Sequence, residues 1–177
     1  MESLYYSRFD TKSPLGTLTL AVSANGLAMI TFGRNGSPGK ENPHWRDVEW
    51  VESADHTTVH VAQLKEYLAG ERREFNFRLD MRGTDFQLRC WHELLRIPYG
   101  QTISYGELAR RISKPTAFRA VGQANHRNPV SIVVPCHRVV GTDKTLTGYG
   151  GGLLSKEWLL KLEGVSVNEQ SPLSFVD

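Results

Sequence analysis

This sequence of 177 residues has little cysteine, no long apolar run and no strong net charge. Its two cysteines, Cys90 and Cys136, are too few for a disulfide framework and lack the close paired spacing of a zinc site. No stretch approaches the roughly 18 apolar residues that a membrane span needs, and residues 1–6 show no secretion signal. We therefore expect a cytoplasmic protein with no bound metal and no membrane contact.

A nucleotide cofactor is not expected either. Residues 148–152 consist of Tyr149 among four glycines, but they lack the Gly-Lys-Ser/Thr ending of a phosphate-binding loop. No acidic ribose ligand follows a βαβ unit. The segment instead predicts a tight loop whose bare backbone approaches a flat substrate, so we expect no cofactor.

The charges are distributed unevenly, although the formal net charge is only +2. Residues 41–80 hold nine acidic and five basic side chains, whereas residues 104–138 hold six basic side chains and a single acid, Glu107. A local surplus of positive charge favours a polyanion as the partner of the second half.

The first 82 residues predict a small α/β domain around an antiparallel sheet. Short runs rich in aromatic, Thr and aliphatic residues predict a three-strand meander over residues 4–9, 17–23 and 27–32, with a hairpin at Asn25-Gly26. Residues 34–50 show no period and predict a surface loop. Helical spacing over residues 57–69 predicts a helix capped by Gly70, and alternation over residues 74–79 is compatible with a further strand.

The second half is mainly helical. Helices are expected over residues 85–96, 104–112, from Thr116 onward and over 155–163, with Thr84 and Ser104 as N-caps. The expected strand at residues 130–134 ends at Pro135. The two central helices, joined by a tight turn at 113–115, are typical of a helix-turn-helix. The sequence thus predicts an α+β protein with an N-terminal domain at 1–82, a DNA-binding domain at 83–165 and a tail at 166–177.

One face of the helix after Thr116 carries a possible contact surface. Ala117, Ala120, Val121 and Ala124 form its apolar stripe, and the side chains on the opposite face are Arg119, Gly122, Gln123 and His126. A helical glycine costs about 1 kcal/mol relative to alanine, so Gly122 suggests that a partner backbone comes close. A solvated face with an incidental glycine is the alternative.

Cys136 is the candidate reactive residue. His137 and Arg138 follow it directly, and an electropositive environment lowers the pKa of a thiol and makes thiolate available. Cys90, inside an amphipathic helix, fits an inert structural thiol. The alternative for Cys136 is an unreactive cysteine at a strand end with two exposed polar neighbours.

A reactive Cys–His pair needs a turn and a third group. Residues i and i+1 do not face each other in a strand or a helix, so Asn128 is a candidate to brace a turn at this point. Glu163 is a candidate to orient the imidazole, because a carboxylate in the last turn of a helix opposes the helix dipole unless a cationic partner compensates. His137 is the candidate for this cationic partner of Glu163.

Several of these segments together resemble one family. The motifs are Pro135 to Val139, Arg119 to Gly122 before them, and Gly148-Tyr149 to Glu163-Gly164 after them. In this order they closely resemble the O6-alkylguanine-DNA alkyltransferases, the methylated-DNA–protein-cysteine methyltransferases. The resemblance is specific over residues 84–164 and looser over the first 80.

The resemblance implies the following roles. Cys136 would be the nucleophile that takes the alkyl group in a single self-inactivating turnover, from O6-alkylguanine and from O4-alkylthymine in double-stranded DNA. The other implied roles are His137 as base through a water, Glu163 as its orienting carboxylate, Asn128 as hinge, Tyr105 as proton donor and aid to base extrusion, and Arg119 as the finger that replaces the flipped nucleotide. The helix from Ala117 would enter the minor groove with Gly122, Gln123 and Arg127 at the DNA, and the protein would act as a monomer.

The pocket differs from that of some relatives. Tyr149, Gly150 and Val139 would line it, together with Ser131 and Asn125. Gly150 stands where some relatives have Ser or Ala, Ser131 where some have Pro, and Asn125 where some have a larger apolar residue. Accommodation of bulky adducts is therefore an open question, and no cysteine is present for the N-terminal zinc site of some relatives.

Two alternatives compete with alkyl transfer. One is a binding module, either a lesion sensor without catalysis or a helix-turn-helix regulator, although alkyltransferase-like sensors carry Trp at the position of Cys136. The other is a cysteine hydrolase that uses Cys136 and His137 and turns over repeatedly.

Overall fold

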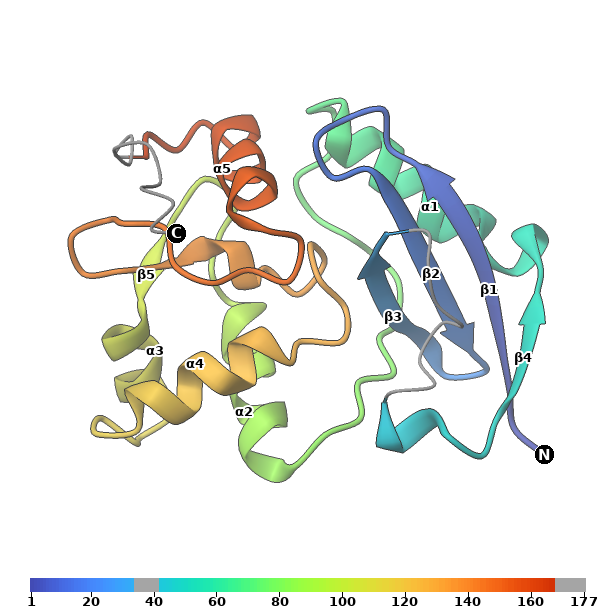
Figure 1. Ribbon diagram of the computed structural model, residues 1–177, viewed down its shortest axis with the longest axis horizontal. Helices are drawn as coiled ribbons and strands as arrows, with labels where there is room; N and C mark the ends of the chain where they lie inside the picture. Colours follow the sequence, from blue (N-terminus) through green and yellow to red (C-terminus); the bar gives the residue numbers. More distant parts are fainter. Residues whose placement is uncertain (34–41, 168–177) are drawn as a thin grey trace, which may run out of the picture.

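The computed structural model describes residues 1–33 and 42–167. The first part forms a four-stranded sheet of β1 (Ser3–Asp10), β2 (Thr17–Ser23), β3 (Gly26–Phe32) and β4 (Glu49–Glu52), in the order β3-β2-β1-β4. Strands β1, β2 and β3 pair antiparallel, which confirms the predicted meander, and β4 runs parallel to β1 (Figure 1). The chain is a mixed α+β protein.

Two sequence predictions about this sheet were wrong. The segment predicted as a surface loop, residues 34–50, contains a short 3-10 helix, η1 (Pro43–Trp45), and its last two residues begin strand β4. Residues 34–41 of this segment are outside the described part of the chain. Residues 74–79 form no strand, and only Leu79 makes an isolated bridge, to Leu27. In place of a hydrogen bond to a neighbouring strand, the Asn76 N–H donates to the side chain of Gln63, at 3.1 Å from its Oε1.

Helix α1 (Ala54–Leu68) packs against the sheet (Figure 1). It begins three residues before the predicted start and ends one residue before the predicted end. Gly70 follows it with a φ of +78°, the left-handed conformation that favours glycine. Its inner face buries Leu64 and Tyr67 completely. Tyr67 thereby reaches the boundary with the second half of the chain.

The second half contains the predicted helices with modified ends. They are α2 (Asp85–Leu94), α3 (Tyr105–Arg111), α4 (Phe118–His126) and α5 (Leu153–Leu162), together with the short strands β5 (Ile103–Ser104) and β6 (Val139–Val140) and the 3-10 helix η2 (Cys136–Arg138). Thr84 and Gln87 form a complete capping box on α2. Ser104 caps α3, but the Glu107 side chain bonds Arg110 and Arg111 instead of closing the box. Ala120 of the predicted apolar stripe is exposed, whereas Val121 and Ala124 are buried.

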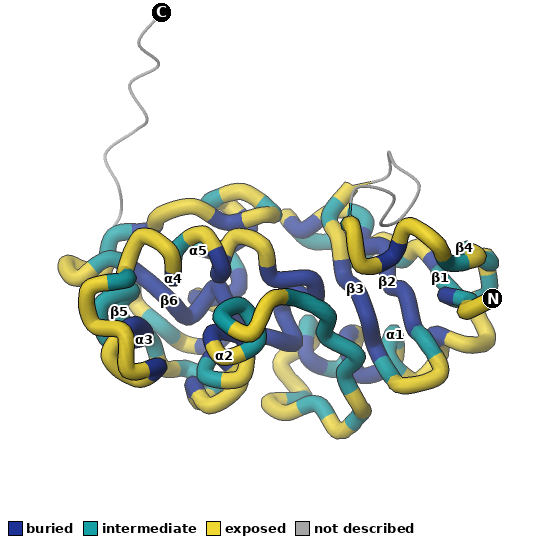
Figure 2. Tube along the Cα trace, turned by 90° about the horizontal axis from the view of Figure 1, so that it is seen from below, coloured by how far each residue is buried: buried dark blue, intermediate teal, exposed yellow. Residues whose placement is uncertain are grey.

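The two halves share one hydrophobic core. Ile30 N–H donates to Pro129 O at 2.9 Å, and the buried residues of β2 and β3 continue into those of α2 and of the segment before Cys136 (Figure 2). The domain boundary at residue 82 stays a prediction, and most of the proposed tail, from residue 168 on, lies outside the described residues. Within the described residues, no helix has the length and apolarity to cross a membrane.

Candidate active site

A tight turn, rather than the predicted strand, delivers Cys136. Val134 N–H donates to Val130 O at 2.9 Å, and Ile132 adopts a φ of +77°. The buried Asn128 braces this turn from both sides, because its Oδ1 accepts from Val130 N–H at 3.0 Å and its Nδ2 donates to Val134 O at 2.7 Å. The 3-10 helix η2 then starts at Cys136, so the chain reverses where the sequence predicted it would leave a strand.

Burial, and not positive charge, dominates the Cys136 thiol. Its residue is only 4% exposed, and burial raises the pKa of the thiol even though Asn128, Lys156 and Ser131 act in the opposite direction. The predicted lowering by His137 and Arg138 was therefore wrong for the free protein. Both side chains bond Glu163, so their donors are engaged elsewhere.

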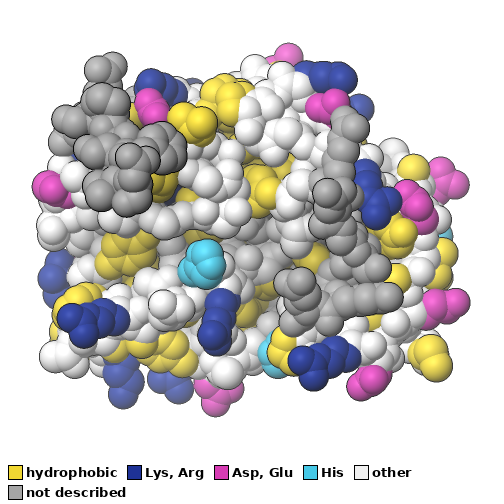
Figure 3. All heavy atoms as spheres, in the orientation of Figure 1, with side chains coloured by type: hydrophobic (Ala, Val, Ile, Leu, Met, Phe, Trp, Pro, Cys, Tyr) yellow, Lys and Arg dark blue, Asp and Glu magenta, His cyan; other side chains and the backbone are white. Residues whose placement is uncertain are grey.

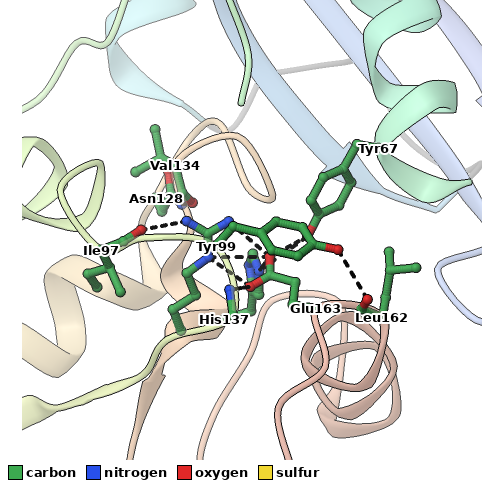
Figure 4. Close-up of polar contacts among 10 residues, drawn as sticks. Tyr67, Ile97, Tyr99, Asn128, Val134, His137, Leu162 and Glu163 are labelled. Carbon is green, nitrogen blue, oxygen red and sulfur yellow. Dashed lines mark hydrogen bonds and ion pairs between the residues drawn. The ribbon is translucent and has the colours of Figure 1, made fainter. Parts of the chain in front are cut away.

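Glu163 is the centre of the polar network around η2 (Figure 4). Its carboxylate is buried and accepts hydrogen bonds from His137 Nε2 at 2.8 Å, from Arg138 Nε and Nη2 at 2.9 to 3.3 Å, and from Gly100 N–H at 3.1 Å. Burial opposes its ionisation, but the bonds and charges of His137 and Arg138 outweigh it and hold the pKa of Glu163 well below its usual range. Arg138 thus supplies the cation that a carboxylate at this helix end requires.

His137 is a buried neutral base. It is fully buried, and burial lowers its pKa despite the opposing effect of Glu163. A carboxylate only accepts hydrogen bonds, so the proton of the neutral ring is assigned to Nε2, which faces Glu163. His137 Nδ1 is then an unprotonated acceptor, and it has no partner among the described residues. The ring is oriented to take up a proton at Nδ1.

Tyr67 is a member of this network that the sequence interpretation missed. Its hydroxyl donates to Glu163 Oε1 at 2.6 Å, from α1 in the first half of the chain. Burial is the first cause that raises the pKa of Tyr67, followed by the charge of Glu163, so the hydroxyl remains a donor. No local motif marks Tyr67, because its partner lies 96 residues further along the chain.

We expect Tyr67→Phe to change the pH dependence of Cys136 reactivity. Loss of a donor to Glu163 strengthens the attraction between the carboxylate and a protonated His137, so the pKa of His137 rises. As the pH falls, His137 then becomes protonated, and unable to act as a base, at a higher pH than in the wild type. The rate of Cys136 alkylation by a free alkylating reagent should fall about fivefold at pH 6 and less at pH 8, since one hydrogen bond is worth about 1 kcal/mol.

Tyr99→Phe is the matched control. Its hydroxyl donates at 3.1 Å to Leu162 O, next to the network but not to the carboxylate. A purely structural role for Tyr67 would give the two variants the same pH profile, and that result would contradict the positioning role.

Lys156 is a second missed residue. Its ammonium is completely buried and donates to Val139 O at 2.6 Å and to Thr147 O at 2.8 Å, which ties β6 to the loop before Tyr149. Burial lowers the pKa of Lys156 to about 8, while interaction with Cys136 acts in the opposite direction. A lysine in the first turn of a helix opposes the dipole as Glu163 does at the other end, and that signal could have identified it.

The predicted pocket residues differ in burial and in their contacts. Tyr149 is buried with its hydroxyl unpartnered among the described residues, and Val139 and Ser131 are buried as well. Asn125 supports the reactive segment itself, because its Nδ2 donates to Cys136 O at 3.3 Å. Gly150 is exposed, so only its backbone could face a ligand.

The predicted DNA-contact residues lie at the surface of α3 and α4. A groove of about 490 Å³ is lined by Tyr105, Phe118, Gly122, Gln123, His126, Thr147 and Gly148. Arg119 is exposed on the same helix, and Figure 3 shows Lys and Arg side chains over this part of the molecule. Arg127 is exposed but lines a different groove, with Thr84 and Gln87.

Fold and site together define a class of protein in which a shielded cysteine is followed by a buried histidine that a carboxylate holds. Family models of the 6-O-methylguanine DNA methyltransferases match residues 4–81 (ribonuclease-like domain) and 85–165 (DNA binding domain). The chain belongs to this family of methylated-DNA–protein-cysteine methyltransferases.

Individual relatives cover nearly the whole chain. The methylated-DNA–protein-cysteine methyltransferase of Methanosarcina acetivorans is 46% identical over 91% of this chain and 99% of its own. The protein of that name from Mycobacterium tuberculosis is 46% identical over 90% of this chain and 92% of its own. A crystal structure of Mycobacterium tuberculosis OGT in complex with DNA superposes with a TM-score of 0.79 at 47% identity, covering 90% of this chain and 92% of that one.

Proposed function

We propose that this protein repairs O6-alkylguanine, and O4-alkylthymine, in double-stranded DNA by moving the alkyl group irreversibly to its own Cys136. The observation that carries the proposal is the buried His137, which follows a shielded thiol, bonds Glu163 through Nε2 and has no partner for Nδ1 among the described residues. Membership of the methyltransferase family gives that arrangement its substrate class.

The chemistry needs only groups of this chain, one water and the substrate. As His137 takes the thiol proton through that water, Cys136 Sγ forms a bond to the alkyl carbon and the carbon–oxygen bond to O6 breaks. The electron pair of that bond passes to the guanine, which gains a proton from Tyr105. The proton taken from sulfur then restores the hydroxyl of Tyr105. The product thioether is a poor leaving group, so each molecule acts once.

Burial of the thiol fits a substrate that is rotated out of the helix. An alkylated base inside a stacked duplex is out of reach, so the enzyme must extrude it at a cost of a few kcal/mol. The Tyr149 hydroxyl, unpartnered among the described residues, and the bare backbone around Gly150 are groups that could receive it. A raised pKa then keeps the sulfur protonated, and protected, until a base fills the pocket.

In the same proposal α3 and α4 act as a helix-turn-helix. Helix α4 enters the minor groove, Arg119 fills the vacancy left by the displaced nucleotide, and Gly122, Gln123 and Arg127 lie along the DNA. The exposed Arg119 and the cationic surface of this half support that arrangement. We propose a monomer that works in the cytoplasm.

We expect Arg119→Ala to separate extrusion from chemistry. A side chain that occupies the vacancy matters only where a base has to leave a duplex, so alkyl transfer from duplex DNA should slow about 100-fold, equivalent to a few kcal/mol. Transfer from free O6-methylguanine base should keep the wild-type rate. Equal losses with both substrates would contradict the finger role.

Titration against O6-methylguanine duplex tests the function itself. We expect transfer of one methyl group per molecule, located by mass spectrometry on the Cys136 peptide, after which the reaction stops. Many product molecules per protein would indicate a cysteine hydrolase, and DNA binding without any mass increase would indicate a binding module. Either result overturns the proposal.

A further inference from the structure

Phe118 is an exposed aromatic residue that the fold itself does not use. It is the first residue of α4, directly before Arg119, and is 51% exposed. Of the large hydrophobic side chains that are exposed in the described part of the chain, Phe118 alone is aromatic. Its removal from water would be favourable, by roughly 25 cal/mol for each Å² of apolar surface covered.

The groove beside Phe118 is shaped for a close neighbour. Phe118 lines it together with Tyr105, Gly122 and Thr147, and no acidic side chain is among the groups that line it. A Cβ at Gly122 would make only ordinary contacts, at 3.9 and 4.0 Å from the Tyr105 ring. Packing within the protein therefore does not require glycine at this position, although glycine disfavours the helix.

The surroundings of Phe118 suit a polyanion. Helix α4 contains no acidic residue, and its N-terminus has Ala117 as an N-cap without a side-chain bond, so its first amides point outward with positive partial charge. Arg119 follows Phe118, and Lys114 is exposed in the turn before it. In Figure 3, hydrophobic side chains lie among the Lys and Arg side chains of this region.

We propose that Phe118 is an apolar DNA contact, which packs against deoxyribose and base edges in the minor groove next to the position that Arg119 fills. Apolar side chains between cationic ones are a common way to bind and open the minor groove. This inference rests on the proposed function for its choice of partner. It adds a contact without charge, which acts on any duplex, whether damaged or not.

The test uses the salt dependence of binding to undamaged duplex DNA. A contact that neutralises no phosphate releases no counterion, so Phe118→Ala should weaken binding about tenfold at every salt concentration and leave the slope of log Kd against log salt unchanged. Lys114→Ala, which removes a charge, should lower that slope. Phe118→Trp keeps an aromatic ring and should bind nearly as the wild type does.

Leu95→Ala is the matched control, because Leu95 is 41% exposed in the same half of the chain but outside this groove. It should leave the Kd unchanged. Wild-type affinity of Phe118→Ala, or an equal loss for Leu95→Ala, would overturn the inference. So would a change in the sedimentation coefficient of Phe118→Ala without a change in Kd, because that would indicate contact between copies of the chain.

The outcome is independent of alkyl transfer. Phe118→Ala should react with free O6-methylguanine base at the wild-type rate, since no duplex is involved. A wild-type protein that binds duplex through Phe118 but removes no alkyl group would overturn the proposed function and leave this contact established.

Discussion

Cys136→Ala is expected to abolish alkyl transfer completely while duplex binding persists. The Cys136 side chain is buried and does not line the groove along α3 and α4 that we propose for DNA, and its loss removes the only proposed acceptor atom. Intact-mass spectrometry after incubation with O6-methylguanine duplex measures the transfer, and a binding titration measures the affinity. A methyl group found on the Cys136→Ala protein would contradict the assignment.

Cys90→Ala provides the control within the same chain. Cys90 is also buried, and burial raises the pKa of its thiol to about 11. It lies in α2, and no imidazole or carboxylate contributes to this change in pKa. We expect this variant to lose about 1 kcal/mol of stability from the small cavity and to accept one methyl group as the wild type does. The two thiols share burial, so a difference between them isolates the role of the His137 and Glu163 network.

Glu163→Gln is expected to lower both stability and reactivity strongly. The side chain of Arg138 is only 9% exposed, and the neutral variant leaves its charge without a buried partner, at a cost of about 3 kcal/mol or more in the free energy of unfolding. The single-turnover rate should fall about 100-fold, because the ring of His137 loses the group that fixes its tautomer. Thermal unfolding and single-turnover kinetics measure the two effects.

The stability difference should itself depend on pH. The pKa of Glu163 in the folded protein is held well below its value of 4.5 in the unfolded chain, so its contribution is fully present at neutral pH. That contribution is lost as the pH falls below 4.5 toward the folded pKa. The free energies of unfolding of the wild type and of Glu163→Gln should therefore become more alike in acid.

Glu107→Gln is the comparison for an exposed carboxylate. Glu107 also bonds two arginines, Arg110 and Arg111, but at the surface of α3, where such pairs contribute little. A loss of stability in Glu107→Gln equal to that in Glu163→Gln would contradict the role of burial.

Local patterns in the sequence were sufficient to predict strands β1 to β3 and the helices of both halves, with ends that differ by a few residues. Strands β1 to β3 were predicted from short runs rich in aromatic, Thr and aliphatic residues and from the Asn25-Gly26 turn. Glu163 was singled out because it opposes the dipole of its own helix. Strand β4 could not be predicted, because its four residues gain their order from parallel pairing with β1, 46 positions earlier.

The state of the thiol was beyond sequence reasoning for a different reason. His137 and Arg138 follow Cys136 directly in sequence, but the 3-10 helix turns both side chains toward Glu163, and burial keeps His137 neutral. Burial depends on all the packed segments together, and here it outweighs the charges nearby. Tyr67 was missed because its partner is determined by the tertiary fold.

The bond from Tyr67 to Glu163 has a consequence for how such proteins can be recombined. The reactive centre belongs to the second half by sequence, but one of its hydrogen bonds comes from α1. A chimera that joins residues 1–82 of one relative to the remainder of another keeps this hydrogen bond only if the first relative has a hydroxyl at the position of Tyr67. The two halves of such proteins therefore cannot be exchanged freely, because one hydroxyl group connects them.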